Sequence, residues 1–328
     1  MQTKILMSTK ENIKTAAAAI KAGELVAFPT ETVYGLGADA LNPAAVRNVF
    51  YAKGRPADNP LIVHFDSADK IESVAYLDKR ALKAVKRFMP GALSIVLKKK
   101  PHVPDEVTAG LDTVAVRIPS NPVAQAFLRE CGVGVAAPSA NTSSRPSPTA
   151  AYHVLEDLNG RIDYILDGGN CPIGLESTVL DFSSDKIRLL RRGGIPLEEL
   201  RLVLGDIEVA CSVESGAGSP KSPGMKYKHY SPNAKVYVRE FGDIAGIESL
   251  RQALKGEGKS VVVLALSQIE EASIMDGEDE YARWLYNEFR TADESGIDAV
   301  ICEKALDFGL GASINCRIIK AAGEINEQ

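Results

Sequence analysis

Residues 8–37, STKENIKTAAAAIKAGELVAFPTETVYGLG, set the fold class of the chain. The segment from Ser8 to Glu11 has the pattern of a capping box, and apolar residues at helical spacing follow it as far as Gly23. The apolar run at residues 25–28 comes directly afterwards, so the pattern predicts a helix that leads into a short buried strand. The same alternation recurs along the chain, which is typical of an α/β protein.

Further apolar runs predict strands at residues 61–65, 94–97, 113–118, 133–137, 162–166, 178–182 and 187–190. Helical patterns predict helices at residues 69–75, 79–88, 122–130 and 149–158. Several of these strands follow one another without an intervening helix. We therefore expect a mixed sheet with antiparallel pairs, not a purely doubly wound one.

Residues 211–232, CSVESGAGSPKSPGMKYKHYSP, are rich in Ser, Gly and Pro and have no periodicity, which is typical of a linker. Beyond them, strands predicted at 235–239, 260–266 and 299–301 alternate with helices predicted at 247–254, 281–291 and 314–322. This alternation predicts a small Rossmann-like α/β domain. We expect domains at 1–205 and 233–328, joined by a linker at 206–232.

Composition limits the function classes. The chain has 328 residues, of which 45% are hydrophobic and 25% charged, as in soluble globular proteins. Its apolar runs are much shorter than the roughly 20 residues of a membrane helix, and its N-terminus lacks the apolar core of a signal peptide. We therefore expect a cytoplasmic protein without membrane contact. The five cysteines include no CxxC pair, so neither a disulfide framework nor a structural zinc is indicated.

The balance of charge differs between the first 232 residues and the rest of the chain. Residues 1–232 carry 28 Lys and Arg against 25 Asp and Glu, whereas residues 233–328 carry 10 against 18. An anionic ligand such as a nucleotide or RNA is expected to bind the first part. The excess there is too small to demonstrate nucleic-acid binding.

The chain has no GxxxxGK[ST] loop and no GxGxxG sequence that opens a helix. Lys53, Gly54 and Arg55 instead form a predicted basic loop, followed closely by Asn59. Lysine as a point charge and arginine as a fork can together bind a triphosphate. A solvated basic loop is the alternative interpretation.

Polar residues follow two predicted strands, at 29–37 and at 136–141. α/β proteins bind ligands at such strand ends, although ordinary turns contain similar residues. His64 lies in an apolar strand, so it either faces the cleft or is a core histidine. Arg117 also lies in a predicted strand, where a guanidinium is costly unless it meets a carboxylate or a bound anion. We favour a substrate carboxylate as its partner.

Six ordered segments together resemble the YrdC-like threonylcarbamoyl-AMP synthases: FPTETVYGLG at 28–37, KGRPADNPLIVH at 53–64, TAGLDTVAVRIP at 108–119, APSANTSSRPSPT at 137–149, ESTVLD at 176–181 and LLRRGG at 189–194. The linker end, PGMKYKHYSP at 223–232, and the small domain resemble the two-domain branch of that family. The resemblance implies a YrdC-like catalytic domain with a twisted mixed sheet and helices, plus a smaller Rossmann-like C-terminal domain. It also implies that the linker is a lid over the product.

The resemblance implies a nucleotidyltransferase that combines L-threonine, bicarbonate and ATP into threonylcarbamoyl-AMP and pyrophosphate. The product serves the threonylcarbamoyladenosine modification of tRNA, with tRNA or tRNA-modification proteins as downstream partners. Mg²⁺ is the expected partner of the pyrophosphate, and no side chain is predicted as a metal ligand. The alternative is a module that binds double-stranded RNA or tRNA without catalysis.

Residue roles are likewise implied by the resemblance. The catalytic residues are Lys53, Arg55, Ser139 and Asn141, and these four also bind ATP. The other ATP-binding residues are Asn59, Thr113, Ser147, Arg191 and Tyr230. The threonine-binding residues are Thr32, His64, Arg117, Ala137 and Ser177. Where the family has LLRPG this chain has LLRRG at 189–193, and the alignment selects Arg191 over Arg192 as the nucleotide contact.

Overall fold

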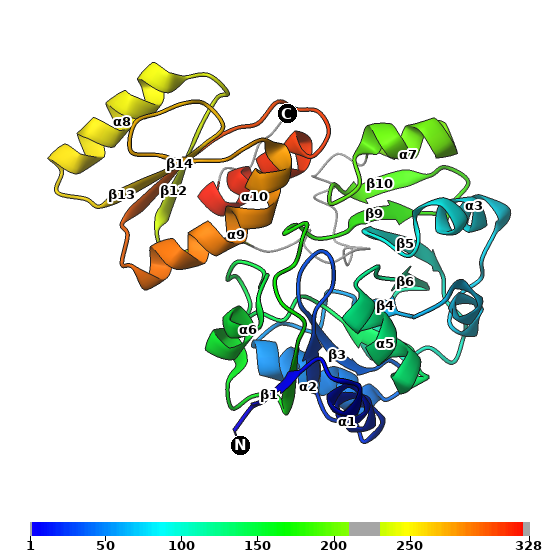
Figure 1. The fold of residues 1–328 in the computed structure, drawn as a ribbon. Helices are drawn as coiled ribbons and strands as arrows, with labels where there is room; N and C mark the ends of the chain where they lie inside the picture. Colours follow the sequence, from blue (N-terminus) through cyan, green and yellow to red (C-terminus); the bar gives the residue numbers. More distant parts are fainter. Residues whose placement is uncertain (1, 210–229, 324–328) are drawn as a thin grey trace. The chain divides into compact units, whose positions relative to one another are not determined.

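The computed structural model describes residues 2–209 and 230–323, which separate into two compact units (Figure 1). The first unit contains most of the chain before residue 210, and the second contains the C-terminal part from Tyr230 onward. Two earlier segments, Ser144–Ser147 and Ile173–Leu175, also belong to the second unit. Most of the predicted linker and lid, including residues 223–229, lies outside the described ranges.

The sheet of the first unit has eleven strands in the order β1-β8-β2-β3-β7-β4-β6-β5-β9-β10-β11. Their bounds are Lys4–Met7 (β1), Val26–Phe28 (β2), Gly35–Asp39 (β3), Ile62–His64 (β4), Leu93–Lys98 (β5), Thr113–Arg117 (β6), Val135–Ala137 (β7), Tyr164–Asp167 (β8), Thr178–Asp181 (β9), Arg188–Arg191 (β10) and Glu208–Val209 (β11). β6 pairs in parallel with β4 and antiparallel with β5. The predicted mixed sheet is confirmed.

The helices of this unit are Lys10–Lys21 (α1), Pro43–Lys53 (α2), Lys79–Phe88 (α3), Asp105–Thr108 (α4), Pro122–Cys131 (α5), Ala151–Leu158 (α6) and Leu197–Leu204 (α7). The helix expected at 69–75 is a 3-10 helix, Ala68–Ser73 (η1). The capping-box prediction was wrong by one residue, because the hydroxyl of Thr9, not Ser8, accepts the hydrogen bond from the Asn12 N–H.

Helix α2 was missed by the sequence patterns. It begins at Pro43 after the N-cap Asn42, whose side chain accepts from two backbone N–H groups. It ends where Gly54 adopts a left-handed conformation with φ of 61°. Lys53 is therefore the last helical residue, and the prediction that it lies in a loop was wrong.

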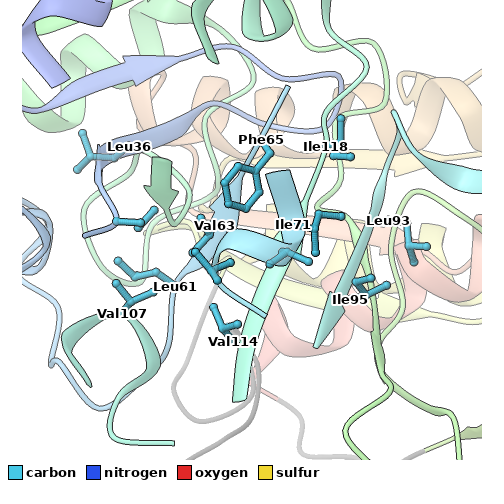
Figure 2. Packing of buried hydrophobic residues seen from close by; sticks show 14 of the residues in the cluster. Leu36, Leu61, Val63, Phe65, Ile71, Leu93, Ile95, Val107, Val114 and Ile118 are labelled. Carbon is cyan, nitrogen blue, oxygen red and sulfur yellow. The ribbon is translucent and has the colours of Figure 1, made fainter. Parts of the chain in front are cut away.

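One face of the central strands packs into the main apolar core, as Figure 2 shows. Val63 of β4, Ile95 of β5 and Val114 of β6 are each at most 1% exposed. Burial of each such side chain contributes about 1.5–3 kcal/mol to folding. Because alternate strand residues point to opposite sides, the neighbouring residues of these strands lie on the other face.

The second unit has a four-stranded, wholly parallel sheet in the order β12-β15-β13-β14. Its strands are Lys235–Arg239 (β12), Val261–Ala265 (β13), Ser273–Ile274 (β14) and Ala299–Glu303 (β15), and its helices are Ile244–Gly256 (α8), Glu278–Glu294 (α9) and Gly311–Ala322 (α10). This confirms the predicted Rossmann-like pattern. Among the described residues, no helix is both long enough and apolar enough to cross a membrane.

Candidate active site

Strand register brings three polar residues into one row on the sheet of the first unit. Arg117 of β6 lies opposite His64 of β4 and opposite Ser94 of β5. Residues directly opposite one another on neighbouring strands point to the same face. His64, Arg117 and Ser94 therefore project from the face opposite the main core.

Other predicted site residues share this face. Ala137 of β7 pairs with Ile62, two residues before His64, and Thr113 lies four residues before Arg117 on β6. At the other side of the row, Arg191 of β10 pairs with Val179 of β9, and Val179 pairs with Ser94. A small apolar cluster lies between these polar residues, formed by Ile62, Val96, Ala115 and Val179. Five predicted site residues thus come together on one face: His64, Thr113, Arg117, Ala137 and Arg191.

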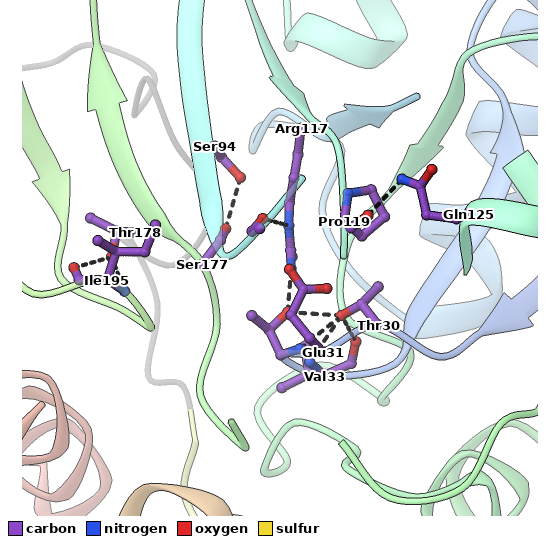
Figure 3. Close-up of polar contacts among 12 residues, drawn as sticks. Thr30, Glu31, Val33, Ser94, Arg117, Pro119, Gln125, Ser177, Thr178 and Ile195 are labelled. Carbon is purple, nitrogen blue, oxygen red and sulfur yellow. Dashed lines mark hydrogen bonds and ion pairs between the residues drawn. The ribbon is translucent and has the colours of Figure 1, made fainter. Parts of the chain in front are cut away.

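Arg117 is bound by residues that follow β2. Its Nη2 donates to Glu31 Oε1 at 2.8 Å, and its Nη1 donates to Thr32 Oγ1 at 2.8 Å (Figure 3). Its Nε donates to the Gly91 carbonyl oxygen at 3.3 Å. Arg117 is 4% exposed and Glu31 is 5% exposed, so the ion pair is buried. The protein thus supplies one carboxylate partner of Arg117, where we had favoured a substrate carboxylate.

The segment after β2 is fixed by its own hydroxyls. Thr30 Oγ1 donates to the Val33 carbonyl oxygen at 2.6 Å and accepts from the Val33 N–H. Thr30 and Thr32 also share a hydrogen bond of 2.8 Å between their hydroxyls. These contacts hold Thr32 beside Arg117, which agrees with its predicted place in the site.

His64 is uncharged at neutral pH. Its Nδ1 lies 2.9 Å from the Ile62 carbonyl oxygen, and its ring packs edge-on against Phe28. Burial, and next the positive charge of Arg117, lower the pKa of His64 from 6.5 to about 3. The histidine therefore adds shape and polarity to this face without adding positive charge.

The side chain of Ser177 connects β5 and β10 through hydrogen bonds. Its hydroxyl lies 2.7 Å from the Ser94 hydroxyl, as Figure 3 shows, and accepts from Arg191 Nη2 at 3.1 Å. Arg191 Nε also donates to the Ser177 carbonyl oxygen. These contacts place the side chain of Arg191 at the row of polar residues and support the choice of Arg191 over Arg192.

Lys53 meets the segment that follows β7. Its ammonium donates to the backbone carbonyl oxygens of Ser139 and Asn141. Ser139 Oγ in turn donates to Asn141 Oδ1 at 2.5 Å. Lys53 is 3% exposed, which excludes the solvated basic loop for this residue. Three of the four predicted catalytic residues therefore form one connected group.

Arg55 and Asn59 are also neighbours, because Arg55 Nη2 donates to the Asn59 carbonyl oxygen at 3.3 Å. The carboxamide of Asn59 is fully buried, and neither its oxygen nor its nitrogen has a hydrogen-bond partner among the described residues. Buried polar groups are nearly always satisfied, so this carboxamide is suited to bind a polar ligand.

Two predicted ATP-binding residues belong to the second unit. Ser147 lies in the segment Ser144–Ser147, and Tyr230 is the first residue of the second described range, 230–323. Both are buried, at 2% and 6% exposure.

The sequence analysis selected the segment at 29–37 but gave no individual role to Glu31 or Thr30, and it missed Ser94. Glu31 and Thr30 lie in the quoted segment PTETV, where the spacing of charged and hydroxyl residues was a usable signal. Ser94 had no such signal, because a serine that begins an apolar strand is common. The described residues include no group of three or more His, Cys, Asp or Glu suited to a metal ion.

The comparisons with known proteins agree with this architecture, a YrdC-like mixed sheet followed by a small parallel sheet. Residues 18–193 match the family described as Telomere recombination, and residues 195–323 match the family described as Threonylcarbamoyl-AMP synthase, C-terminal domain. The chain belongs to the threonylcarbamoyl-AMP synthase family, in its two-domain form. The resemblance inferred from the six segments is confirmed.

Whole-length relatives include the threonylcarbamoyl-AMP synthase of Pyrococcus abyssi, which is 45% identical over 95% of this chain and 94% of its own length. The Bacillus subtilis threonylcarbamoyl-AMP synthase is 44% identical over 97% of this chain and 95% of its own length. The crystal structure of P. abyssi Sua5 complexed with L-threonine superposes with a TM-score of 0.93 and covers 98% of both chains at 44% identity.

Proposed function

We propose that this protein is a nucleotidyltransferase that forms threonylcarbamoyl-AMP and pyrophosphate from L-threonine, bicarbonate and ATP. One observation carries the proposal: the chain is 44–45% identical over nearly its whole length to synthases of that name. The convergence of His64, Thr113, Arg117, Ala137 and Arg191 on one sheet face supports it.

Arg117 is proposed to bind the threonine carboxylate. A guanidinium has five N–H groups, and the three hydrogen bonds of Arg117 within the described ranges use three of them. The other two N–H groups are available to an incoming carboxylate. Glu31 and Thr32 then fix the plane of the guanidinium, because each binds a different nitrogen.

His64, Ala137 and Ser177 are proposed to contact the rest of the threonine molecule. A neutral His64 leaves Arg117 as the group that attracts the carboxylate, because the lowered pKa of His64, about 3, prevents a second positive charge at neutral pH. The Ser177 hydroxyl is held by Ser94 and Arg191, so it is oriented before the substrate binds.

The nucleotide is proposed to bind Lys53, Arg55, Asn59, Ser139 and Asn141, together with Thr113, Ser147, Arg191 and Tyr230. Lys53 fixes the backbone at Ser139 and Asn141 and supplies positive charge beside it. Adenylyl transfer requires positioned cations and in-line geometry more than a nucleophilic side chain.

Mg²⁺ is proposed to arrive on the triphosphate. The ion often keeps several waters and binds through substrate phosphates, so it does not require a cage of protein ligands. When bound, it neutralises charge on the pyrophosphate leaving group. The chain's own cations then bind the remaining phosphate oxygens.

The domain boundaries at 1–205, 206–232 and 233–328 remain part of the proposal, as does a lid formed by the linker. A carbamoyl-adenylate reacts with water, so exclusion of solvent would protect the product. The product is proposed to serve tRNA modification, with tRNA or tRNA-modification proteins downstream.

Pyrophosphate release from purified protein tests the proposal. Release is expected only when threonine, bicarbonate, Mg²⁺ and ATP are all present, and mass spectrometry should detect threonylcarbamoyl-AMP. Serine in place of threonine is the matched control for recognition of the side chain. Pyrophosphate release that is indifferent to threonine would refute the proposal.

A further inference from the structure

Two arginines in the second unit are almost completely inaccessible to solvent. Arg290 of α9 is 0% exposed and Arg317 of α10 is 1% exposed, and they are the largest fully buried side chains of the described chain. Burial of a guanidinium costs several kcal/mol unless the charge is well partnered. Their contacts should therefore show what offsets this cost.

Arg290 binds a loop that precedes it by more than a hundred residues. Its Nη2 donates to the Pro146 carbonyl oxygen at 2.6 Å, in a buried contact. Ser144, in the same loop, accepts a hydrogen bond of 3.2 Å from the Ser231 N–H. The segment Ser144–Ser147 is thus attached to the second unit at two points, and it includes Ser147.

Arg317 lies beside Tyr230. Its guanidinium carbon is 5.4 Å from the centre of the Tyr230 ring, within the range of a cation–π contact. Tyr286 of α9 also stacks on Tyr230, with ring centres 5.5 Å apart. The ring of Tyr230 is therefore fixed by side chains from both α9 and α10.

A third segment, Ile173–Leu175, approaches the backbone of α9. A Cβ atom added to Gly174 would lie 2.4 Å from the Ala282 carbonyl oxygen and 2.5 Å from the Arg283 Cα. Gly174 also has a φ of 80°, a conformation that other residues rarely adopt. Only glycine fits there.

We propose that α9 and α10 position the nucleotide-binding residues Ser147 and Tyr230, with Arg290 and Arg317 as the positioning residues. The inference rests on the proposed function, because that function assigns Ser147 and Tyr230 to ATP. Both arginines are too buried to touch a ligand, so they act through the residues they contact. The second unit thereby contributes to ATP affinity rather than to threonine affinity.

Arg290→Lys and Arg317→Lys test the inference, because lysine keeps the charge but loses the planar fork. The dissociation constant of a non-hydrolysable ATP analogue with Mg²⁺ is expected to rise about tenfold, the loss of one charge-assisted contact. The dissociation constant for threonine should change by less than about twofold. Calorimetric titration of the full chain measures both.

Arg251→Lys is the matched control. Arg251 is a buried arginine of the same unit, and it binds Glu248 and the Glu270 carbonyl oxygen, away from the three segments. Its replacement should leave ATP affinity unchanged. Equal weakening of ATP and threonine binding, or the same loss in Arg251→Lys as in Arg290→Lys, would overturn the inference.

Hydrogen exchange gives a readout that is independent of the proposed function. The amides of Ser144, Arg145 and Ser147 should exchange about tenfold faster in Arg290→Lys than in the parent, and those of residues 173–175 faster in Gly174→Ala. Unchanged exchange at 144–147 would contradict the inference. Parent protein that binds neither ATP nor threonine would refute the proposed function, whereas a parent that binds both, with unchanged ATP affinity and exchange in Arg290→Lys, would overturn the inference alone.

Discussion

Glu31 and Glu303 are both buried carboxylates beside a strand end, one in each unit, and their surroundings differ. Glu303 accepts hydrogen bonds from the Gly242, Leu266 and Ser267 N–H groups and from the Ser267 hydroxyl. Burial acts to raise the pKa of Glu303, but these bonds outweigh it and lower the pKa. Both oxygens of Glu303 are satisfied within the protein.

Glu31 has one oxygen bound to Arg117, whereas its Oε2 is buried without a hydrogen-bond partner among the described residues. Because both of its oxygens accept hydrogen bonds, Glu303 links the end of β15 to the segments that follow β12 and β13. A half-satisfied carboxylate beside a buried cation is typical of a ligand site, because full satisfaction would leave no group for the substrate. The difference separates the structural cluster around Glu303 from the site proposed around Arg117.

Arg117→Met is expected to have the largest effect. It removes the proposed carboxylate contact and leaves Glu31 without its partner, so kcat/KM for threonine should fall about 1000-fold, or about 4 kcal/mol. Steady-state pyrophosphate release at varied threonine measures this. Arg251→Met, a buried arginine elsewhere, should stay within about threefold of the parent. An equal rise in KM for ATP and for threonine would argue against the carboxylate role.

Glu303→Gln is expected to lower stability more than it lowers activity. The amide replaces one acceptor with a donor that faces backbone N–H groups, so the free energy of unfolding should fall by about 3 kcal/mol. Activity of the folded enzyme should change less than threefold. Urea unfolding followed by circular dichroism gives the stability. Lost threonine affinity without lost stability would contradict the structural role of Glu303.

The pH dependence of stability distinguishes the site that contains His64 and Arg117 from the cluster around Glu303. Below pH 6.5 the unfolded chain protonates this histidine, whereas the folded protein keeps it neutral down to about pH 3. The unfolded state therefore binds more protons, and stability should fall by about 2.5 kcal/mol from pH 6.5 to pH 4.5. The lowered pKa of Glu303 acts only below its ordinary value of 4.5, outside this window.

The comparison variant for this measurement is His64→Asn, which cannot titrate. The parent should lose stability between pH 6.5 and pH 4.5 and the variant should not lose it through this residue. The difference between their free energies of unfolding should therefore become smaller as the pH falls. Parallel stability curves for the two proteins would show that the pKa of His64 is not lowered in the folded state.

Ser94→Ala is expected to have the smallest effect. It removes the hydrogen bond to Ser177, so KM for threonine should rise about fivefold, equivalent to about 1 kcal/mol. Ser73→Ala is the control, because the exposed Ser73 hydroxyl donates to the nearby Lys70 carbonyl oxygen in η1. Identical KM values for the two variants would remove Ser177 from the threonine site.

Most strands of the first unit were predicted because their apolar runs are local signals. Strand β3 was not predicted because it contains two glycines, and helix α2 was not predicted although Asn42, Pro43 and buried apolar residues at helical spacing signal it. Close packing explains one of these glycines, because a Cβ at Gly37 would lie 2.7 Å from a Val135 methyl group. Such a reason is visible only in three dimensions.

The order of the six segments was enough to specify the family, the mixed sheet and the identity of most proposed site residues, because each segment combines a strand with the polar residues at its end. The folded structure decided which of these residues contact one another. Glu31 and Arg117 are 86 positions apart, and so are Lys53 and Ser139. Contacts at that separation depend on strand register and burial, which local patterns do not encode. The same burial lowers the pKa of His64 and makes Arg290 and Arg317 inaccessible.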